Sequence, residues 1–157
     1  FNGYFFCNKH QVKQYLDFAY ENGYVFDILV LCKTNPSPLC NNVYLPDTEY
    51  IIFIKEKGVK LNTTYHTGSR FWVRSVYKNK FDHPTVKDTT VLERMIVNSS
   101  NEGDIVLDPF MGSGSTAVVC QQMRRNFIGF EMEQKYIDMT NERLTNTVPN
   151  AKEEQTK

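Results

Sequence analysis

Apolar and polar residues along the first part of the chain follow the periods of strands and helices. Residues 4–7, 25–31 and 49–54 are short, nearly continuous apolar runs, a pattern typical of buried strands. Residues 10–21 carry apolar side chains at close to helical spacing and are followed by Gly23, so we expect a helix there. A loop containing prolines and asparagines separates the second and third strands, which favours an antiparallel pair.

The last part of the chain has a different, repeating pattern of strands and helices. We expect a helix over 88–99, strands over 105–107 and 127–130 with a helix over 116–123 between them, and a final amphipathic helix over 133–146. Asp88 supplies a polar start for the first of these helices. The strand, loop, helix and strand together form a unit of about 30 residues, which is the core of a nucleotide-binding sheet.

Composition is that of a globular protein, but its charge is unevenly distributed. The 157 residues are 41% hydrophobic and 23% charged, which fits one domain with a real core. No apolar run approaches the roughly 18 residues of a membrane-spanning helix, so we expect no membrane partner. Residues 55–87 contain eight basic and two acidic residues, a balance of +6, against −2 before this segment and −4 after it. A polyanion is therefore expected to meet the middle of the chain.

The cysteines indicate neither a disulfide framework nor a metal site. They are Cys7, Cys32, Cys40 and Cys120, and no two form a C-x-x-C pair. A small secreted domain stapled by disulfides would have more of them, so we expect reduced thiols and a cytoplasmic protein. Zinc binding by the middle two cysteines with His66 and His83 would require spacings that match no known zinc site, and we expect no metal.

The chemistry is concentrated in a glycine-rich loop after the strand 105–107. Gly112 and Gly114 have no Cβ, so a ligand can approach the backbone there. Glu131, at the end of the next strand, can accept hydrogen bonds from both hydroxyls of a ribose. A tight turn beside a solvated acid would explain a lone glycine pair. The complete order of strand, loop, helix, strand and acid favours a nucleoside-type ligand instead.

Two nucleoside ligands compete for this loop. Gly112 to Ala117 fits the pattern G-x-G-x-x-[GA], and Glu131 lies 19 residues beyond Gly112, which is a dinucleotide fingerprint and keeps an NAD-binding oxidoreductase fragment as an alternative. Asp108, however, places a carboxylate where a pyrophosphate would need hydrogen-bond donors. That carboxylate suits a cationic ligand group better.

The sequence DPFMGSGST at 108–116 resembles the D-P-F-x-G-S-G-T-T motif of amino-DNA methyltransferases. The sequence FIGFE at 127–131, followed by Tyr136 and Arg143, is similar to that family's I-G-x-E…Y…R stretch. HPTVK at 83–87 resembles its H-P-T-x-K-P segment, with Asp88 in place of the final proline. Similarity continues in one register through the first strands, and the cofactor motif comes last, as in the β arrangement of these enzymes.

The resemblance implies an α/β fold, a Rossmann-like methyltransferase sheet with an antiparallel strand pair, and S-adenosylmethionine as cofactor. The implied cofactor-binding residues are Lys87, Asp108, Pro109, Phe110, Gly112, Ser113, Gly114 and Glu131. Phe110 fits the pocket and the core equally well, whereas we expect Phe130 in the core. The implied activity is methylation of an exocyclic amino group of DNA, adenine N6 in preference to cytosine, as in restriction–modification systems.

One family feature is absent from this sequence. The catalytic tetrad D-P-P-Y or S-P-P-Y should precede Tyr4, and it occurs nowhere in the chain. In the family its strand lies between the strand that ends at Asp108 and the strand over 4–7. We therefore expect no catalytic residue here, a sheet incomplete at its N-terminal side, and an inactive chain unless a missing N-terminal segment or a second chain completes it. A catalytically inactive cofactor- or DNA-binding module is the alternative.

The basic middle segment is the expected target-recognition region, with double-stranded DNA as partner. Its candidate DNA contacts are Arg70, Arg74, Lys78 and Lys80, interleaved with the aromatic residues Phe71, Trp72 and Tyr77. A solvated surface loop with core aromatics is the alternative. We expect one methyltransferase domain over 1–146, with strands in 1–56, an insertion over 57–84 and the cofactor part over 85–146, and a disordered tail over 147–157.

Overall fold

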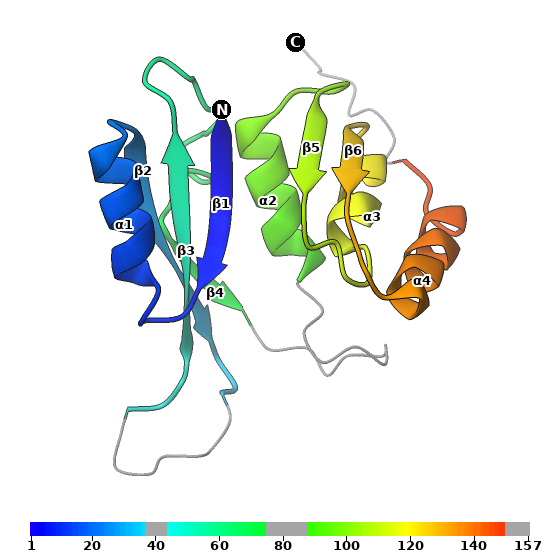
Figure 1. Cartoon of the computed structure of the whole chain (residues 1–157), viewed down its shortest axis with the longest axis horizontal. Coiled ribbons are helices and arrows are strands. Elements are labelled where there is room, and N and C mark those ends of the chain that lie inside the picture. The colour runs from blue at the N-terminus through cyan, green and yellow to red at the C-terminus, as the bar shows by residue number, and fades with distance from the viewer. Residues whose placement is uncertain (37–43, 75–87, 150–157) are drawn as a thin grey trace. The chain divides into compact units, whose positions relative to one another are not determined.

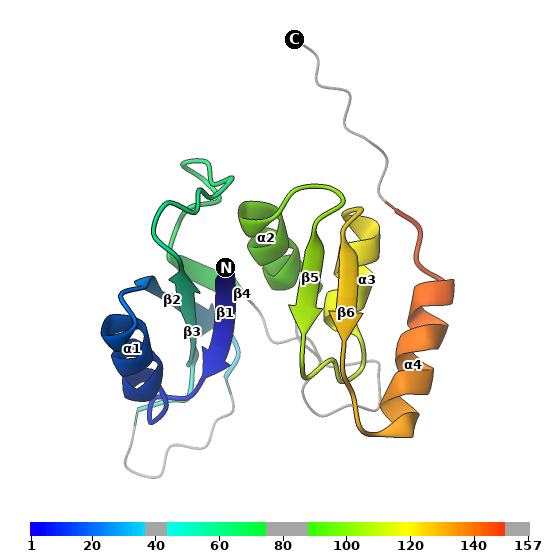
Figure 2. The same ribbon diagram turned by 45° about the horizontal axis from the view of Figure 1, so that its top comes forward.

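The computed structural model describes residues 1–36, 44–74 and 88–149 (Figures 1 and 2). The chain divides into two compact units, Phe1–Lys78 and Asn79–Lys157, and each is described by itself. The expected domain over 1–146 and the disordered tail stay predictions. Within the described residues, no helix has the length and hydrophobicity needed to cross a membrane.

The first unit is a four-stranded mixed sheet with one helix. Its elements are β1 (Asn2–Cys7), α1 (Val12–Glu21), β2 (Val25–Lys33), β3 (Thr48–Lys55) and β4 (Phe71–Arg74), and the strand order is β1-β3-β2-β4. β3 runs antiparallel to both β1 and β2, so the expected antiparallel pair is confirmed. β4 pairs in parallel with β2 and was not expected, because a four-residue strand inside a polar segment has no recognisable period.

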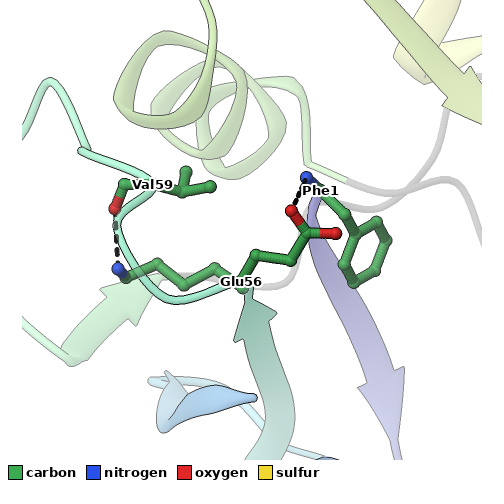
Figure 3. A network of polar contacts seen from close by, with 4 residues as sticks. Phe1, Glu56 and Val59 are labelled. Carbon is green, nitrogen blue, oxygen red and sulfur yellow. Dashed lines mark hydrogen bonds and ion pairs between the residues drawn. The ribbon is translucent and has the colours of Figure 1, made fainter. Parts of the chain in front are cut away.

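The core of this unit follows from the central position of β3. Ile51 to Ile54 are all buried, because β3 is paired on both edges. Ile52 and Ile54 share one face of the pleat and pack with Ala19 of α1, which lies on that face of the sheet (Figure 1). Beyond the strand, the Lys55 ammonium donates a hydrogen bond to the Val59 carbonyl oxygen at 2.6 Å, which closes the following turn (Figure 3).

The same turn is tied to the beginning of β1. The Glu56 backbone N–H donates to the Phe1 carbonyl oxygen at 3.0 Å, and the Glu56 carboxylate lies 3.3 Å from the Phe1 amino nitrogen (Figure 3). The Phe1 ring in turn lies 5.9 Å from the Tyr24 ring, centroid to centroid. These contacts fix the register at which β1 enters the sheet.

The second unit is a two-stranded parallel sheet with three helices. Its elements are α2 (Thr89–Ser99), β5 (Ile105–Asp108), α3 (Ser115–Gln122), β6 (Asn126–Gly129) and α4 (Gln134–Thr145). All five were predicted, with ends within one or two residues. The register pairs Asp108 with Gly129, so the two strands end level with each other. The segments that follow them, the glycine-rich loop and the residues from 130 onwards, therefore begin side by side.

Each sheet ends at a strand that pairs on one side within the described part of the chain. β1 pairs with β3 alone and β5 with β6 alone. Ile105, Leu107 and Ile128 share one face of the small sheet, with 65%, 61% and 49% of their surface exposed. Parallel strands are normally covered on both faces. This face of the small sheet is therefore open in the described part of the chain.

Candidate functional site

The glycine-rich loop joins β5 to α3 in a conformation that requires glycine. Gly112 and Gly114 have φ values of 54° and 77°, in the left-handed region that side chains disfavour. A Cβ at Gly114 would also lie 2.5 Å from atoms of Thr140 on α4, so the loop packs against that helix without space for a side chain. Gly112 is partly exposed and Gly114 is buried, so the predicted approach of a ligand to the loop backbone stays a prediction.

Asp108 holds the loop from the end of β5. One carboxylate oxygen accepts a hydrogen bond from the Phe110 N–H at 3.0 Å, and the other accepts from the Thr116 hydroxyl at 2.6 Å. Thr116 had no predicted role of its own. Its position as the second residue of α3, directly after the loop, is the signal that could have identified it, because a hydroxyl in the first turn of a helix can reach the end of the preceding strand.

The Glu131 carboxylate already accepts hydrogen bonds from backbone N–H groups, which the interpretation as a ribose-binding residue did not anticipate. Its Oε2 accepts from the Gly112 N–H at 2.8 Å, and its Oε1 accepts from the N–H groups of Met132 and Glu133 at 2.8 and 2.9 Å. A carboxylate offers about four acceptor positions. Two ribose hydroxyls could therefore both bind only if at least one of these donors moves. Glu131 also connects β6, the loop and the start of α4.

Exposed apolar side chains accompany the two carboxylates. Phe110, Phe130 and Met132 follow the ends of β5 and β6 and are 87%, 59% and 97% exposed. The expectation that Phe130 lies in the core is wrong, because Phe130 follows the last residue of β6 and more than half of its surface is exposed. Met132 was not among the predicted site residues. An apolar residue between two acidic ones, Glu131 and Glu133, is a pattern that could have indicated an exposed apolar side chain there. Large exposed apolar side chains in a group indicate a binding surface.

The remaining predicted cofactor residues divide into three cases. Pro109 is exposed beside Phe110. Ser113 is buried, and its side chain lies toward α4, where the Arg143 guanidinium is 3.3 Å from the Ser113 hydroxyl. Burial lowers the pKa of Arg143. Lys87 lies outside the described residues. The cofactor roles of all these residues stay predictions.

The predicted DNA-contacting residues are only partly described. Arg74 is exposed at the end of β4, whereas Arg70 forms an ion pair with Asp27, N to O 3.0 Å. Trp72 is not available for stacking on a base: it is 5% exposed and its indole N–H donates to the Ser69 carbonyl oxygen. Trp72 is the one buried residue of β4 and forms part of the core. Lys78, Lys80 and Tyr77 lie outside the described residues.

An exposed aromatic residue in the same segment was missed. Tyr65 is 95% exposed, in a turn closed by the Gly68 N–H donating to the Thr64 carbonyl oxygen at 2.8 Å. Hydrogen bonds between Thr64 and Thr67 hold the same turn. The sequence TTYHTG contains the threonines and glycine of such a turn, which is the signal that could have identified it.

The thiols and imidazoles do not gather into a metal site within the described part of the chain. No group of three or more His, Cys, Asp or Glu side chains is placed to hold an ion there. Cys7, Cys32 and Cys120 are free thiols. Cys40 and His83 lie outside the described ranges.

Comparisons with known proteins place the chain in a family. The DNA methylase family matches residues 2–142, and the chain belongs to it. The Type II methyltransferase M2.DpnII of Streptococcus pneumoniae is 35% identical over 130 residues, which are 71% of this chain and 48% of that protein. M.HpaI of Haemophilus parainfluenzae, also a Type II methyltransferase, is 54% identical over 67 residues, 43% of this chain and 21% of that protein.

A solved structure supports the same assignment. The crystal structure of the M1.HpyAVI–SAM complex is 35% identical and aligns with a TM-score of 0.76 over 91% of this chain and 74% of that one. The expected α/β fold and the resemblance to amino-DNA methyltransferases are thus confirmed. The chain spans about half the length of M2.DpnII and less of M.HpaI. An oxidoreductase fragment finds no support in these relatives.

Proposed function

We propose that this chain is the cofactor-binding and DNA-reading part of a DNA methyltransferase that uses S-adenosylmethionine and methylates adenine at N6. One observation carries the proposal. Asp108 and Glu131 flank the glycine-rich loop at the level ends of β5 and β6, with Phe110, Phe130 and Met132 exposed beside them. The family membership and the M1.HpyAVI–SAM complex support it.

The residues of the site fit this cofactor better than they fit a dinucleotide. S-adenosylmethionine carries an ammonium and a sulfonium, and its ribose offers hydroxyl donors, all of which suit the carboxylates of Asp108 and Glu131. Its adenine ring suits the exposed apolar side chains. The pyrophosphate of NAD would instead bring negative charge against the Asp108 carboxylate, which is unfavourable.

The cofactor, when bound, supplies an electrophilic methyl group on a positively charged sulfur. The residues of this chain would bind and orient it: Asp108 on the amino acid portion, Glu131 on a ribose hydroxyl, and Phe110 and Met132 over apolar surface. Such positioning holds the methyl group in line with the target nitrogen and lowers the barrier by orientation. We assign no residue of this chain to the target amino group, and the chain alone is expected to be inactive.

The DNA-reading role rests on the exposed basic and aromatic residues of the first unit. Lys57, Lys60 and Arg74 are exposed, and the turn that carries Tyr65 presents an aromatic ring between them in sequence. Phosphates attract such cations, and bases stack on exposed rings. Because Arg70 is paired with Asp27, Arg74→Ala should weaken duplex binding more than Arg70→Ala does, and should reduce the salt dependence by about one charge.

A catalytically inactive cofactor- or DNA-binding module is the second candidate. The test places a segment carrying the tetrad before Phe1 and incubates the product with duplex DNA and labelled S-adenosylmethionine, with the shorter chain as control. N6-methyladenine among the hydrolysed nucleosides is the expected result. N4-methylcytosine in its place would show that the target base is cytosine. Failure to methylate despite intact cofactor and DNA binding would establish the inactive module.

A further inference from the structure

We infer that Arg143 and Thr140 of α4 are positioning residues that hold the glycine-rich loop in its cofactor-binding conformation. The inference rests on the proposed S-adenosylmethionine site and goes beyond it, because it assigns a role to a helix that contributes no predicted ligand contact. Thr140 and Arg143 are three residues apart and thus share one face of α4. That face meets the loop.

Arg143 contacts the loop through its Nη1. Its Nη1 donates to the Ser113 carbonyl oxygen in a short hydrogen bond and lies 3.3 Å from both the Ser113 and the Ser115 hydroxyl oxygens. Ser113 and Ser115 are 4% and 6% exposed, so water has little access to these groups. A charged donor to a buried carbonyl oxygen is among the stronger hydrogen bonds in proteins.

Thr140 contacts the loop one residue earlier. Its hydroxyl donates to the Gly112 carbonyl oxygen at 3.2 Å, and its side chain occupies the space where a Cβ of Gly114 would lie. The N–H of the same Gly112 donates to Glu131, on the other side of the loop. The loop is therefore held from two sides, by Glu131 after β6 and by α4.

These contacts have a consequence for the ligand. The Ser113 carbonyl and the Ser113 and Ser115 hydroxyls are directed to Arg143 of α4, which ties the middle of the loop to that helix. Without Arg143, the loop would populate alternative conformations. Part of the free energy of cofactor binding would then be used to order the loop in its binding conformation. The loss of one charge-assisted contact predicts binding weaker by about tenfold to a hundredfold.

The test compares Arg143→Met with a matched arginine elsewhere in the same unit. Arg125 is also partly buried and donates to the carbonyl oxygens of Met123 and Ser100, both of which lie outside the loop. Arg125→Met therefore removes comparable hydrogen bonds without touching Gly112 or Ser113. Arg143→Lys retains a cation that can still make some of the contacts with the loop. Ser115→Ala removes one acceptor of Arg143 and serves as the test if Arg143→Met does not fold.

Two readouts are measured on the 157-residue chain: amide hydrogen exchange of residues 112–116 without ligand, and calorimetric affinity for S-adenosylmethionine. We expect faster loop exchange and weaker binding in Arg143→Met, partial recovery in Arg143→Lys, a smaller change in Ser115→Ala, and wild-type loop exchange in Arg125→Met. Wild-type loop exchange in Arg143→Met, or equally fast exchange in Arg125→Met, would overturn the inference. If the wild-type chain binds no S-adenosylmethionine, the proposed cofactor fails, and the exchange result still decides the role of Arg143.

Discussion

At the scale of single residues, two glycines distinguish the energetic cost of a left-handed backbone conformation from the cost of a steric clash. Gly114 and Gly103 both have positive φ, 77° and 86°, but a Cβ on Gly114 would meet Thr140 at 2.5 Å whereas one on Gly103 would meet nothing within 4 Å. Gly103→Ala should cost about 1 kcal/mol, the conformational penalty alone. Gly114→Ala should cost about 1–3 kcal/mol more, because a buried β-branched side chain must move.

Urea unfolding of both variants measures the difference. Calorimetry with S-adenosylmethionine adds a second comparison, since we expect lost affinity in Gly114→Ala and unchanged affinity in Gly103→Ala. Equal destabilisation of the two variants would contradict the packing of α4 against the loop.

Cys120 predicts a pH dependence. This thiol is fully buried in α3, and burial raises its pKa to about 11 from an ordinary value of 9.0, with Arg125 lowering and Asp108 raising it by smaller amounts. Between these two values the unfolded thiol loses its proton while the folded thiol keeps it. The unfolded state then binds fewer protons, so the free energy of unfolding should fall by up to about 3 kcal/mol as pH rises through this window.

Denaturant unfolding just below and well above pH 9 measures this loss, with Cys120→Ala as control. The variant is expected to start from lower stability, because its side chain leaves a small cavity, and to lose less stability at alkaline pH. A variant with the same alkaline loss as the wild-type chain would show that other groups are responsible.

At the scale of elements, the period of the apolar residues was sufficient to predict nine of the ten helices and strands that the structure describes. Strand β4 was not predictable, because its identity depends on pairing with β2, about 40 residues earlier, and on burial of one side chain, Trp72. The site divides in the same way. Asp108, Glu131 and the glycines were visible in the sequence, whereas the contacts of Thr140 and Arg143 depend on α4 folding back onto the loop.

The start of α2 offers a test at this scale. One Asp88 carboxylate oxygen accepts from the Thr90 N–H and hydroxyl, and the other is buried without a hydrogen-bond partner among the described residues. Asp88→Ala removes the cap and should cost about 1 kcal/mol of unfolding free energy. Asp88→Asn should cost less than Asp88→Ala, because it keeps the oxygen that accepts from Thr90. Thermal unfolding of the two variants decides: a loss in Asp88→Asn equal to that in Asp88→Ala would mean that the charge is needed.

At the scale of the whole molecule, the chain has features of its family, but the two sheets that the structure describes have open edges. The chain contains the cofactor loop and the basic segment, but β1 and β5 each pair on one side among the described strands, and the face bearing Ile105 and Leu107 is exposed. Open edges and apolar faces are costly to leave in water. We therefore propose that a further segment or a second chain completes the sheet and supplies the catalytic tetrad.

We propose that the chain binds S-adenosylmethionine through the loop and Glu131. Titration calorimetry of the 157-residue chain with S-adenosylmethionine and with NAD, with Glu131→Gln as the variant, measures this binding. Gln keeps one accepting oxygen but has an amide nitrogen that cannot accept from Gly112, so it changes the charge and one contact while preserving size. We expect binding of S-adenosylmethionine, weakened by about tenfold or more in Glu131→Gln, and no binding of NAD. Binding of NAD in preference, or equal affinity of the wild-type chain and Glu131→Gln for S-adenosylmethionine, would refute the assignment of the loop and Glu131 to this cofactor.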